Sequence, residues 1–307
     1  MKPDTPKITM LILTYNRADL VERTIQSVLA QSYKDYELVL VDNGSVDATP
    51  EVFEKYRKEE NVRIFRIEEN IGFARGFNYC LDQIRGEWFA TVGDDDTIRE
   101  DALELLFDVL DKVDSDLTAV SSNGWDTSTN DYSGIGLSAD QYLPIETIVQ
   151  KCDGDFWGMT KTSLIRDIRL NPNIPGLEDT FWYKVDAAAK RYYIHQPLIT
   201  YYTNHGGNET QKQSADIGVK SKLYKELLSE PFFWEVLQKY NKKQFRDRCI
   251  KAMHFLKAAG EETLYRTYRQ MLLDDRPGLK YRMHSQLIGL LSPSMLTQLY
   301  QMKRKAS

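Results

Sequence analysis

Residues 8–17 read ITMLILTYNR, a continuous apolar run from Ile8 to Leu13 that is followed at once by polar side chains. A strand without polar–apolar alternation is typical of a parallel sheet that is covered by helices on both faces. The polar residues 14–17 would then lie at the carboxyl edge of the sheet, where open α/β folds bind their ligands. This stretch therefore predicts the fold class and the edge at which a site should lie.

The first 125 residues repeat this alternation of apolar strand-like runs and amphipathic helical runs. Repeated β-α-β units predict an α/β fold with a Rossmann-like, mostly parallel central sheet flanked by helices. Residues 123–144 are rich in Gly, Ser, Thr, Asn and Asp, and we expect a loop there. Short strands at 156–160 and 192–202 should enclose a helix that begins near Thr180, and the pattern is helical from residue 216 onward. We therefore predict an α/β domain over residues 1–215 and a helical C-terminal appendage over residues 216–307.

The composition is that of a globular protein, with 42% hydrophobic and 28% charged residues among 307. The apolar runs are strand-sized and too short to span a membrane, and the N-terminus lacks the apolar segment of a secretory signal. The three cysteines, Cys80, Cys152 and Cys249, are widely and irregularly spaced, which favours structural thiols in a reducing, cytoplasmic compartment.

The charge is unevenly distributed, because residues 216–307 carry 18 Lys/Arg against 9 Asp/Glu while the remainder carries 22 against 36. Leu287, Leu291 and Leu299 belong to an apolar stripe that precedes Lys303-Arg304-Lys305. One interpretation is peripheral contact with the inner face of a cell membrane. The alternative is packing of the stripe on a neighbouring helix or on a second subunit, as in a homodimer. Nucleic acid is not an expected partner, since no recognised binding motif accompanies the charge.

Three consecutive carboxylates, Asp94, Asp95 and Asp96, follow the apolar run 88–92 and Gly93. Like charges this close favour a neutralising cation, and hard oxygen ligands suit Mn²⁺ or Mg²⁺ beside a phosphate-bearing substrate. The alternative is a solvated acidic turn that caps the helix starting near Glu100.

The other strand ends carry Thr14-Tyr15-Asn16-Arg17 and Asp42-Asn43-Gly44-Ser45. Tyr15 could stack on a base and Asp42 could accept from a base N–H or a ribose hydroxyl, whereas Asn16 and Asp42 could instead only cap helices. Neither the glycine-rich dinucleotide motif nor the P-loop motif occurs, so a phosphate would be held by a metal and side chains, with Arg17 and Arg75 as the nearest cations.

Taken in order, the stretches 10–17 (MLILTYNR), 40–45 (LVDNGS), 70–78 (NIGFARGFN) and 93–96 (GDDD) resemble family 2 glycosyltransferases over about residues 7–205. The resemblance implies a GT-A fold, a nucleotide-diphospho-sugar donor, UDP-linked in the first instance, a divalent metal and inversion at the anomeric carbon. It implies base contact by Asp42, ribose contact by Asp94, and metal ligation by Asp95, with Asp96 as the second choice. His205 resembles a further metal ligand or diphosphate contact of the family. The full donor-binding set implied is Thr14, Tyr15, Asn16, Arg17, Asp42, Gly72, Arg75, Asn78 and Asp94.

The resemblance continues to residues 176–182 (GLEDTFW), which are similar to the acidic pair of the family's acceptor site. Asp179 is the expected catalytic base and Glu178 the alternative, because an inverting transfer needs one carboxylate to take the acceptor's proton. Acidic residues that only favour the start of a helix are the structural alternative. The absence of a Q-x-x-R-W segment argues against a processive polysaccharide synthase.

The predicted function is therefore transfer of one sugar to a hydroxyl of a glycan or lipid-linked acceptor in surface glycan or polysaccharide biosynthesis. An aspartyl phosphohydrolase fits less well, since its D-x-D-x-[TV] motif follows the first strand rather than the fourth. A catalytically silent glycan-binding or scaffold protein with the same fold is the alternative, because a fold does not secure a function.

Overall fold

The computed structural model describes residues 5–203 and 216–306, with side chains as far as Met302. The chain divides into two compact units, one formed by residues 1–172 and 181–208 and the other by residues 173–180 and 209–307. The expected domain boundary at residue 215 lies at the end of a segment outside the described residues and stays a prediction.

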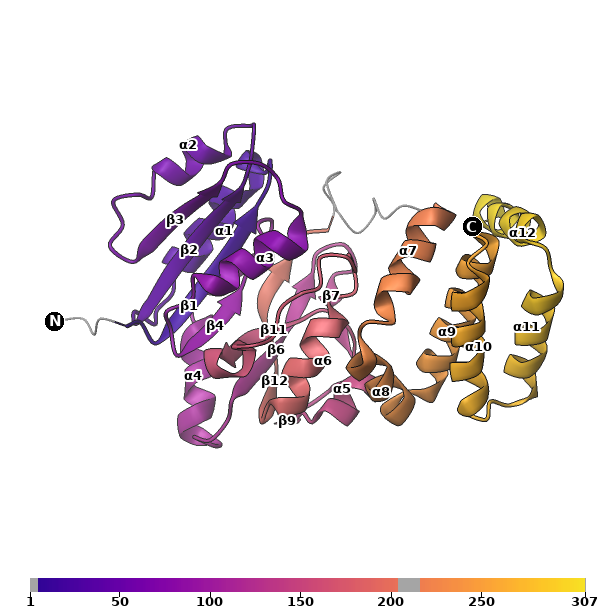
Figure 1. The fold of residues 1–307 in the computed structure, drawn as a ribbon. Helices are drawn as coiled ribbons and strands as arrows, with labels where there is room; N and C mark the ends of the chain where they lie inside the picture. Colours follow the sequence, from indigo (N-terminus) through magenta and orange to yellow (C-terminus); the bar gives the residue numbers. More distant parts are fainter. Residues whose placement is uncertain (1–4, 204–215, 307) are drawn as a thin grey trace. The chain divides into compact units, whose positions relative to one another are not determined.

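The first unit is built on one large sheet, with the strand order β3-β2-β1-β4-β11-β6-β12-β5 (Figure 1). The first four strands pair in parallel, and β6 pairs in parallel with β12, whereas β11 is antiparallel to both of its neighbours. The predicted α/β class with a central sheet flanked by helices is confirmed, and the parallel arrangement is strongest in the N-terminal half. The strands of this path are β1 Ile8–Thr14, β2 Tyr36–Asn43, β3 Val62–Ile67, β4 Trp88–Thr91, β5 Thr97–Ile98, β6 Ala119–Asp126, β11 Phe156–Lys161 and β12 Arg191–Tyr201.

Helices cover both faces of this sheet, which explains why β1 is apolar at consecutive positions. Ile8, Met10 and Ile12 pack with α1, α2 and α4, whereas Leu11 packs with α3 and α6 on the opposite face. Burial of both faces leaves the strand ends as the only part of β1 that a ligand can reach. The helices are α1 Ala18–Leu29, α2 Thr49–Glu54, α3 Phe73–Asp82, α4 Ala102–Lys112 and α6 Asp179–Ala188.

The expectation of a loop over residues 123–144 is wrong. Strand β6 continues to Asp126, and β7 Asp131–Tyr132, β8 Gly134–Ile135 and β9 Gln141–Tyr142 follow before α5 Ile145–Lys151. The buried Asn123 amide donates to the Gly134 carbonyl at 2.8 Å and to the Tyr193 hydroxyl at 3.0 Å, and its oxygen accepts from the Gly134 N–H at 2.8 Å. The polar composition therefore serves pairing, because a buried amide satisfies backbone groups that water would satisfy in a loop. The short β10 Asp153–Gly154 pairs with β8, and the 3₁₀ helix η1 Thr162–Ile165 follows β11.

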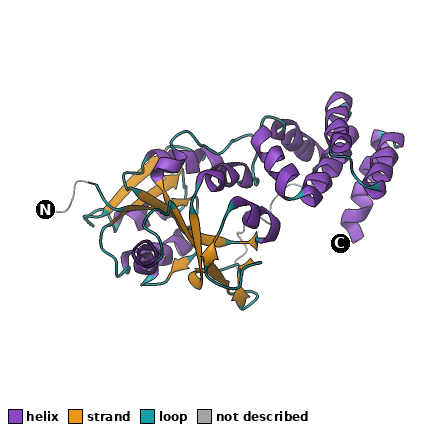
Figure 2. Cartoon of the chain, turned by 90° about the horizontal axis from the view of Figure 1, so that it is seen from below, coloured by secondary structure: helices purple, strands orange, loops and turns teal. Residues whose placement is uncertain are grey.

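From residue 217 the second unit is helical, as predicted, and Figure 2 shows the strands confined to the first unit. Tyr265, Tyr268 and Leu272 form the buried face of α10, as the sequence pattern predicts. The Tyr268 hydroxyl donates to the Tyr224 carbonyl at 2.6 Å and joins α10 to α7. The helices are α7 Ile217–Leu227, α8 Pro231–Tyr240, α9 Lys242–Ala258, α10 Glu262–Asp274, α11 Leu279–Leu290 and α12 Pro293–Ala306.

None of the helices in the described part of the chain is long and apolar enough to cross a bilayer. Cys80, Cys152 and Cys249 are free thiols. Burial raises the pKa of Cys80 and of Cys249 to about 12, so neither supplies a thiolate at neutral pH.

Candidate functional site

Three of the residues expected to bind a donor are neighbours at the carboxyl edge of the sheet. Thr14 at the end of β1 is the register partner of Asp42 on β2. The Thr14 hydroxyl donates to Asp94 Oδ2 at 2.6 Å, from β1 to the loop that follows β4. Parallel pairing of β2, β1 and β4 therefore brings together side chains that lie up to 80 residues apart in the chain.

Asp42 has one satisfied and one unsatisfied carboxylate oxygen. The residue is 1% exposed, and its Oδ1 accepts from the Ser45 N–H at 2.8 Å. Its Oδ2 is buried and has no hydrogen-bond partner among the described residues, although Arg66 Nη1 lies 3.6 Å away. A buried acceptor without a partner is costly unless a ligand supplies the missing donor. This oxygen is suited to accept from a base N–H.

In the acidic loop after β4, two carboxylates pack close to Gly93. A Cβ atom built on Gly93 would lie 2.4 Å from Asp96 Oδ2 and 3.3 Å from Asp95 Oδ1. Two carboxylate oxygens from different residues thus lie on the side of the glycine that a side chain there would occupy. Asp95 is oriented by Arg17, whose Nη1 donates to Asp95 Oδ2 at 2.8 Å.

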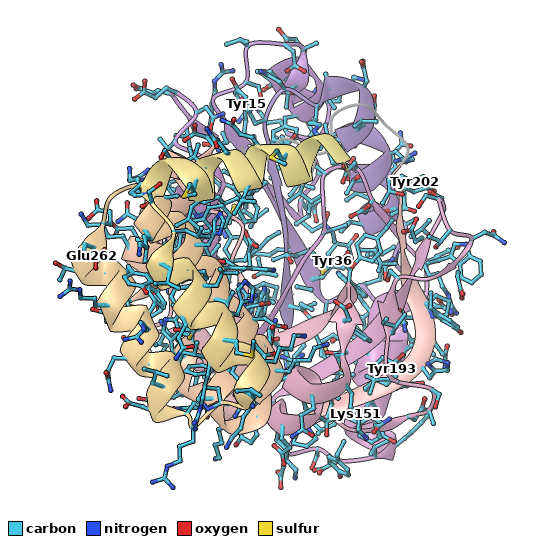
Figure 3. The ribbon with its side chains drawn as sticks, turned by 90° about the vertical axis from the view of Figure 1, so that its right-hand side faces the viewer. Tyr15, Tyr36, Lys151, Tyr193, Tyr202 and Glu262 are labelled. Carbon is cyan, nitrogen blue, oxygen red and sulfur yellow. The ribbon has the colours of Figure 1, made fainter. Side chains whose placement is uncertain are left out.

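Three residues that the sequence did not indicate hold the backbone and side chains of this loop. Arg23 Nη2 donates to the Asp95 carbonyl at 2.6 Å, and the Thr24 hydroxyl donates to the Asp96 carbonyl at 2.7 Å. The Tyr202 N–H donates to Asp96 Oδ1 at 3.3 Å, and the Arg23 guanidinium lies 3.6 Å from the centre of the Tyr202 ring. Figure 3 labels Tyr202, beyond the end of β12, and Tyr15, beyond the end of β1. No motif marks Arg23 or Thr24, because they lie inside an ordinary amphipathic helix.

Burial makes the ionised form of this acidic loop unfavourable. Burial raises the pKa of Asp94 to about 6, against the lowering effect of the Thr14 hydrogen bond and the Arg17 charge. Burial, with the added charge of Asp95, raises the pKa of Asp96 to about 7. A cation beside these carboxylates would favour their charged forms.

Asp95 and Asp96 are the side chains in this loop that could hold a divalent cation with few ligands from the protein. Within residues 5–203 and 216–306, no three acidic, histidine or cysteine side chains are arranged to enclose a metal ion. Mg²⁺ at phosphate sites commonly takes one or two carboxylates and completes its shell with water and phosphate oxygens. Asp95 and Asp96 supply such a pair. His205, the third expected ligand, lies outside the described residues.

The alternative in which Asn16, Asp42 and the acidic loop 94–96 only cap helices is wrong. Helices α1, α2 and α4 begin without a side-chain cap hydrogen bond. The Asn16 side-chain oxygen instead accepts from the Val46 N–H at 2.8 Å, and the Asn16 N–H donates to the Ser45 hydroxyl at 2.9 Å. Asn16, with a φ of 53°, therefore ties the end of β1 to the turn after β2.

The remaining residues that were expected to bind the sugar donor differ in solvent exposure. Tyr15 is exposed, and Arg75 is exposed in the first turn of α3 with no ion-pair partner within the described parts of the chain. Gly72 precedes α3 with a φ of 81°, a conformation that favours glycine. Asn78 has a structural task, because its amide donates to the Leu170 carbonyl at 2.9 Å and accepts from the Leu170 N–H at 2.8 Å.

The expected acidic pair, Glu178 and Asp179, belongs to the second compact unit. Asp179 is the first residue of α6, and its Oδ2 lies 3.6 Å from Arg248 Nη2 of α9. Glu178, immediately before the helix, is half-buried. The assignment of either as the base stays a prediction.

A comparison with protein families matches residues 9–189 to glycosyl transferase family 2. The GalNAc(5)-diNAcBac-PP-undecaprenol beta-1,3-glucosyltransferase of Campylobacter jejuni is 29% identical over 203 residues, which are 64% of each protein. The putative teichuronic acid biosynthesis glycosyltransferase TuaG of Bacillus subtilis is 34% identical over 100 residues, 32% of this chain and 40% of TuaG. The chain thus spans less than two thirds of the length of these two curated relatives.

Two solved structures share the fold. S. aureus TarS, residues 1–349, in complex with UDP-GlcNAc superimposes with a TM-score of 0.65 and 17% identity, over 91% of this chain and 90% of that one. The mannosyltransferase PcManGT of Pyrobaculum calidifontis, in complex with GDP-Man and Mn²⁺, gives a TM-score of 0.51 and 16% identity, over 92% and 86%.

Proposed function

The chain belongs to glycosyl transferase family 2, and from this membership we propose that it transfers a single sugar from a UDP-sugar to an acceptor hydroxyl with inversion at the anomeric carbon. The observation that carries the proposal is the cluster of Thr14 and Asp42, at the ends of neighbouring strands, with Asp94 in the loop after β4, next to Asp95 and Asp96 beside Gly93. This cluster places Asp42, whose Oδ2 can accept from a base, close to Asp95 and Asp96, two carboxylates suited to a cation.

In this proposal the uracil N–H donates to Oδ2 of Asp42, which has no hydrogen-bond partner among the described residues, and Asp94 accepts from a ribose hydroxyl. The structure of TarS with UDP-GlcNAc supports a UDP-linked donor, because the fold is shared. Tyr15 and Arg75, both exposed at this edge, would contact the base and the diphosphate.

Asp95 and Asp96 would hold Mn²⁺ or Mg²⁺, and the neighbour with bound Mn²⁺ supports this choice. When bound, the ion neutralises charge on the departing nucleoside diphosphate. Arg17 orients the Asp95 carboxylate through the 2.8 Å bond to Oδ2, and Asp95 Oδ1 lies on the side of Gly93. The side chains of Arg23 and Thr24 donate hydrogen bonds to the backbone carbonyls of Asp95 and Asp96, and these bonds fix the backbone that carries the two carboxylates.

We propose Asp179 as the base that removes the acceptor proton, with Glu178 as the alternative. A carboxylate that takes the proton while the hydroxyl attacks allows a single displacement, which inverts the anomeric centre. Asp179 is half-exposed, so an acceptor hydroxyl can reach its carboxylate.

The acceptor would be a glycan or a lipid-linked glycan in polysaccharide biosynthesis at the cytoplasmic side of the membrane. The Campylobacter relative, a GalNAc(5)-diNAcBac-PP-undecaprenol beta-1,3-glucosyltransferase, supports this class. In the same proposal residues 1–215 form the transferase domain and residues 216–307 a helical domain.

The test is release of UDP from a panel of UDP-sugars by the full chain, with Mn²⁺ and with EDTA, together with a thermal-shift assay for UDP binding. We expect metal-dependent binding and turnover, since a ligand that binds only the native state raises its melting temperature. Asp179→Asn and Glu178→Gln form a matched pair. Loss of turnover with retained UDP binding in Asp179→Asn alone supports Asp179 as the base. No metal-dependent nucleotide binding and no UDP release with any donor would favour a silent scaffold.

A further inference from the structure

The last two helices carry charge of one sign only. Residues 276–307 contain six Lys/Arg and no Asp or Glu. Three of the six, Arg276, Lys280 and Arg282, lie at or near the start of α11 and are exposed, and the other three are Lys303, Arg304 and Lys305 near the end of α12. An anionic surface that met these helices would find no opposing carboxylate on them.

The same helices expose large apolar side chains. On α11 the exposed fractions are 73% for Leu279, 59% for Met283, 54% for Leu287 and 85% for Leu290. These positions are four, four and three residues apart, so they form one stripe along the helix. On α12, Met295, Leu299 and Met302 are exposed at similar spacing. We call these seven side chains the apolar stripe.

The opposite sides of both helices are already packed. Ser285 and Ile288 of α11 and Leu296 of α12 are almost fully buried. Lys257 of α9 donates to the Gly289 carbonyl of α11, and the Phe255 ring of α9 packs edge-on against Tyr300 of α12, with the ring centres 5.1 Å apart. The apolar stripe is therefore surplus to folding of the unit, because the helices are anchored without it.

Lys280 and Arg282 flank the apolar stripe of α11. At about 100° of rotation per residue, Lys280 lies on one side of the line from Leu279 to Leu290 and Arg282 lies on the other. A helix with an apolar line and basic flanks is suited to lie in the interface of an anionic bilayer, with its apolar side chains among the acyl chains.

We propose that α11 and α12 form a docking surface for anionic phospholipid membranes. Charge selects this occupant over a second copy of the chain, since two such surfaces would bring like charges together. Each basic residue near an anionic leaflet adds to binding, and salt screens that attraction. The inference rests on these two helices and not on the proposed sugar transfer.

The test is co-sedimentation of the full chain with vesicles of phosphatidylglycerol and phosphatidylcholine, compared with vesicles of phosphatidylcholine alone. We expect binding to the anionic vesicles that weakens with added salt. The double variant Met283→Gln/Leu287→Gln should lose about tenfold or more of its partitioning, because two apolar side chains no longer enter the interface. Lys280→Gln should weaken anionic binding by about fivefold.

The matched control is Val219→Gln on α7, an exposed apolar residue of the same unit that is not part of the stripe. It should bind vesicles like the unaltered chain, and all variants should keep the melting temperature because each changed side chain is exposed. Equal binding of the double variant and the control would overturn the proposal. So would equal binding to both vesicle types, or a dimer in solution that the double variant dissociates. The readout is independent of sugar transfer, so an inactive protein that binds anionic vesicles would still support the docking surface.

Discussion

Replacement of Gly93 by alanine tests the role of the Asp95 and Asp96 carboxylates beside it. The added Cβ would lie 2.4 Å from Asp96 Oδ2, which is closer than atoms approach in folded proteins. Relief requires the carboxylate to move by roughly 1 Å, given ordinary contact distances for carbon. The atom that must move is the end of a side chain, so rotation of the Asp96 carboxylate can relieve the clash and the fold should survive.

A displacement of this size at a reacting centre can cost about 100-fold in rate. We therefore expect Gly93→Ala to lower Mn²⁺-dependent UDP release by about 100-fold. UDP binding measured with Mn²⁺ should weaken as well, whereas binding measured with EDTA should change little. The melting temperature should stay near that of the unaltered protein.

Gly278→Ala is the matched control, because a Cβ there meets no atom within 4 Å and its φ is −63°. The control should leave UDP release and binding unchanged. If Gly93→Ala retained release and Mn²⁺-dependent UDP binding within about twofold of the unaltered protein, Asp95 and Asp96 would not hold a cation that assists transfer. A folded variant with that activity would refute the reasoning from Gly93.

Three further predictions concern single carboxylates. Asp42→Asn should weaken UDP binding by about tenfold or more in a titration, since a hydrogen bond to a charged acceptor is lost; unchanged affinity would contradict base contact. Asp186→Ala should lower the free energy of unfolding by about 3–5 kcal/mol in urea, because it leaves the buried Arg191 without the partner now 2.6 Å away; a loss below about 1 kcal/mol would contradict this. Hydrogen bonds, first from Lys190, lower the pKa of Asp114 from 3.8 to about 2. The stabilisation by ionised Asp114 is therefore present above about pH 4 and is lost as the pH falls through 2. The urea midpoint of Asp114→Asn should lie below that of the unaltered protein at pH 7 and approach it below pH 4. A difference between the two midpoints that stays constant with pH would contradict a lowered pKa for Asp114.

Much of the first unit could be predicted because its pattern is local. Residues 62–67 (VRIFRI) form strand β3, and α2 begins at Thr49 next to Pro50, a residue that favours the first turn of a helix. Burial on both faces imposes an unbroken apolar run, and this is readable without knowledge of the neighbours. The part of strand β6 from Asn123 to Asp126 was not predicted, because its stability depends on the side chain of Asn123 and on partners as distant as Tyr193.

The candidate site likewise has residues that could be predicted from the sequence and residues that could not. The strand-end residues Thr14 and Asp42 could be identified, because parallel strands end at one edge of the sheet. Arg23 and Tyr202 could not, since they reach Asp95 and Asp96 across 72 and 106 residues of chain. Such contacts leave no periodic signal in a single sequence.

The sequence by itself determined the alternation of strands and helices before residue 123 and the chemistry at the strand ends, because side-chain type and spacing act along the chain. Only the tertiary structure decided that Asp42 keeps a buried oxygen without a hydrogen-bond partner among the described residues, and that Asp95 and Asp96 converge beside Gly93. It also decided which side of α11 is exposed. These properties depend on which atoms meet in space, and that depends on the pairing and packing of elements distant in sequence.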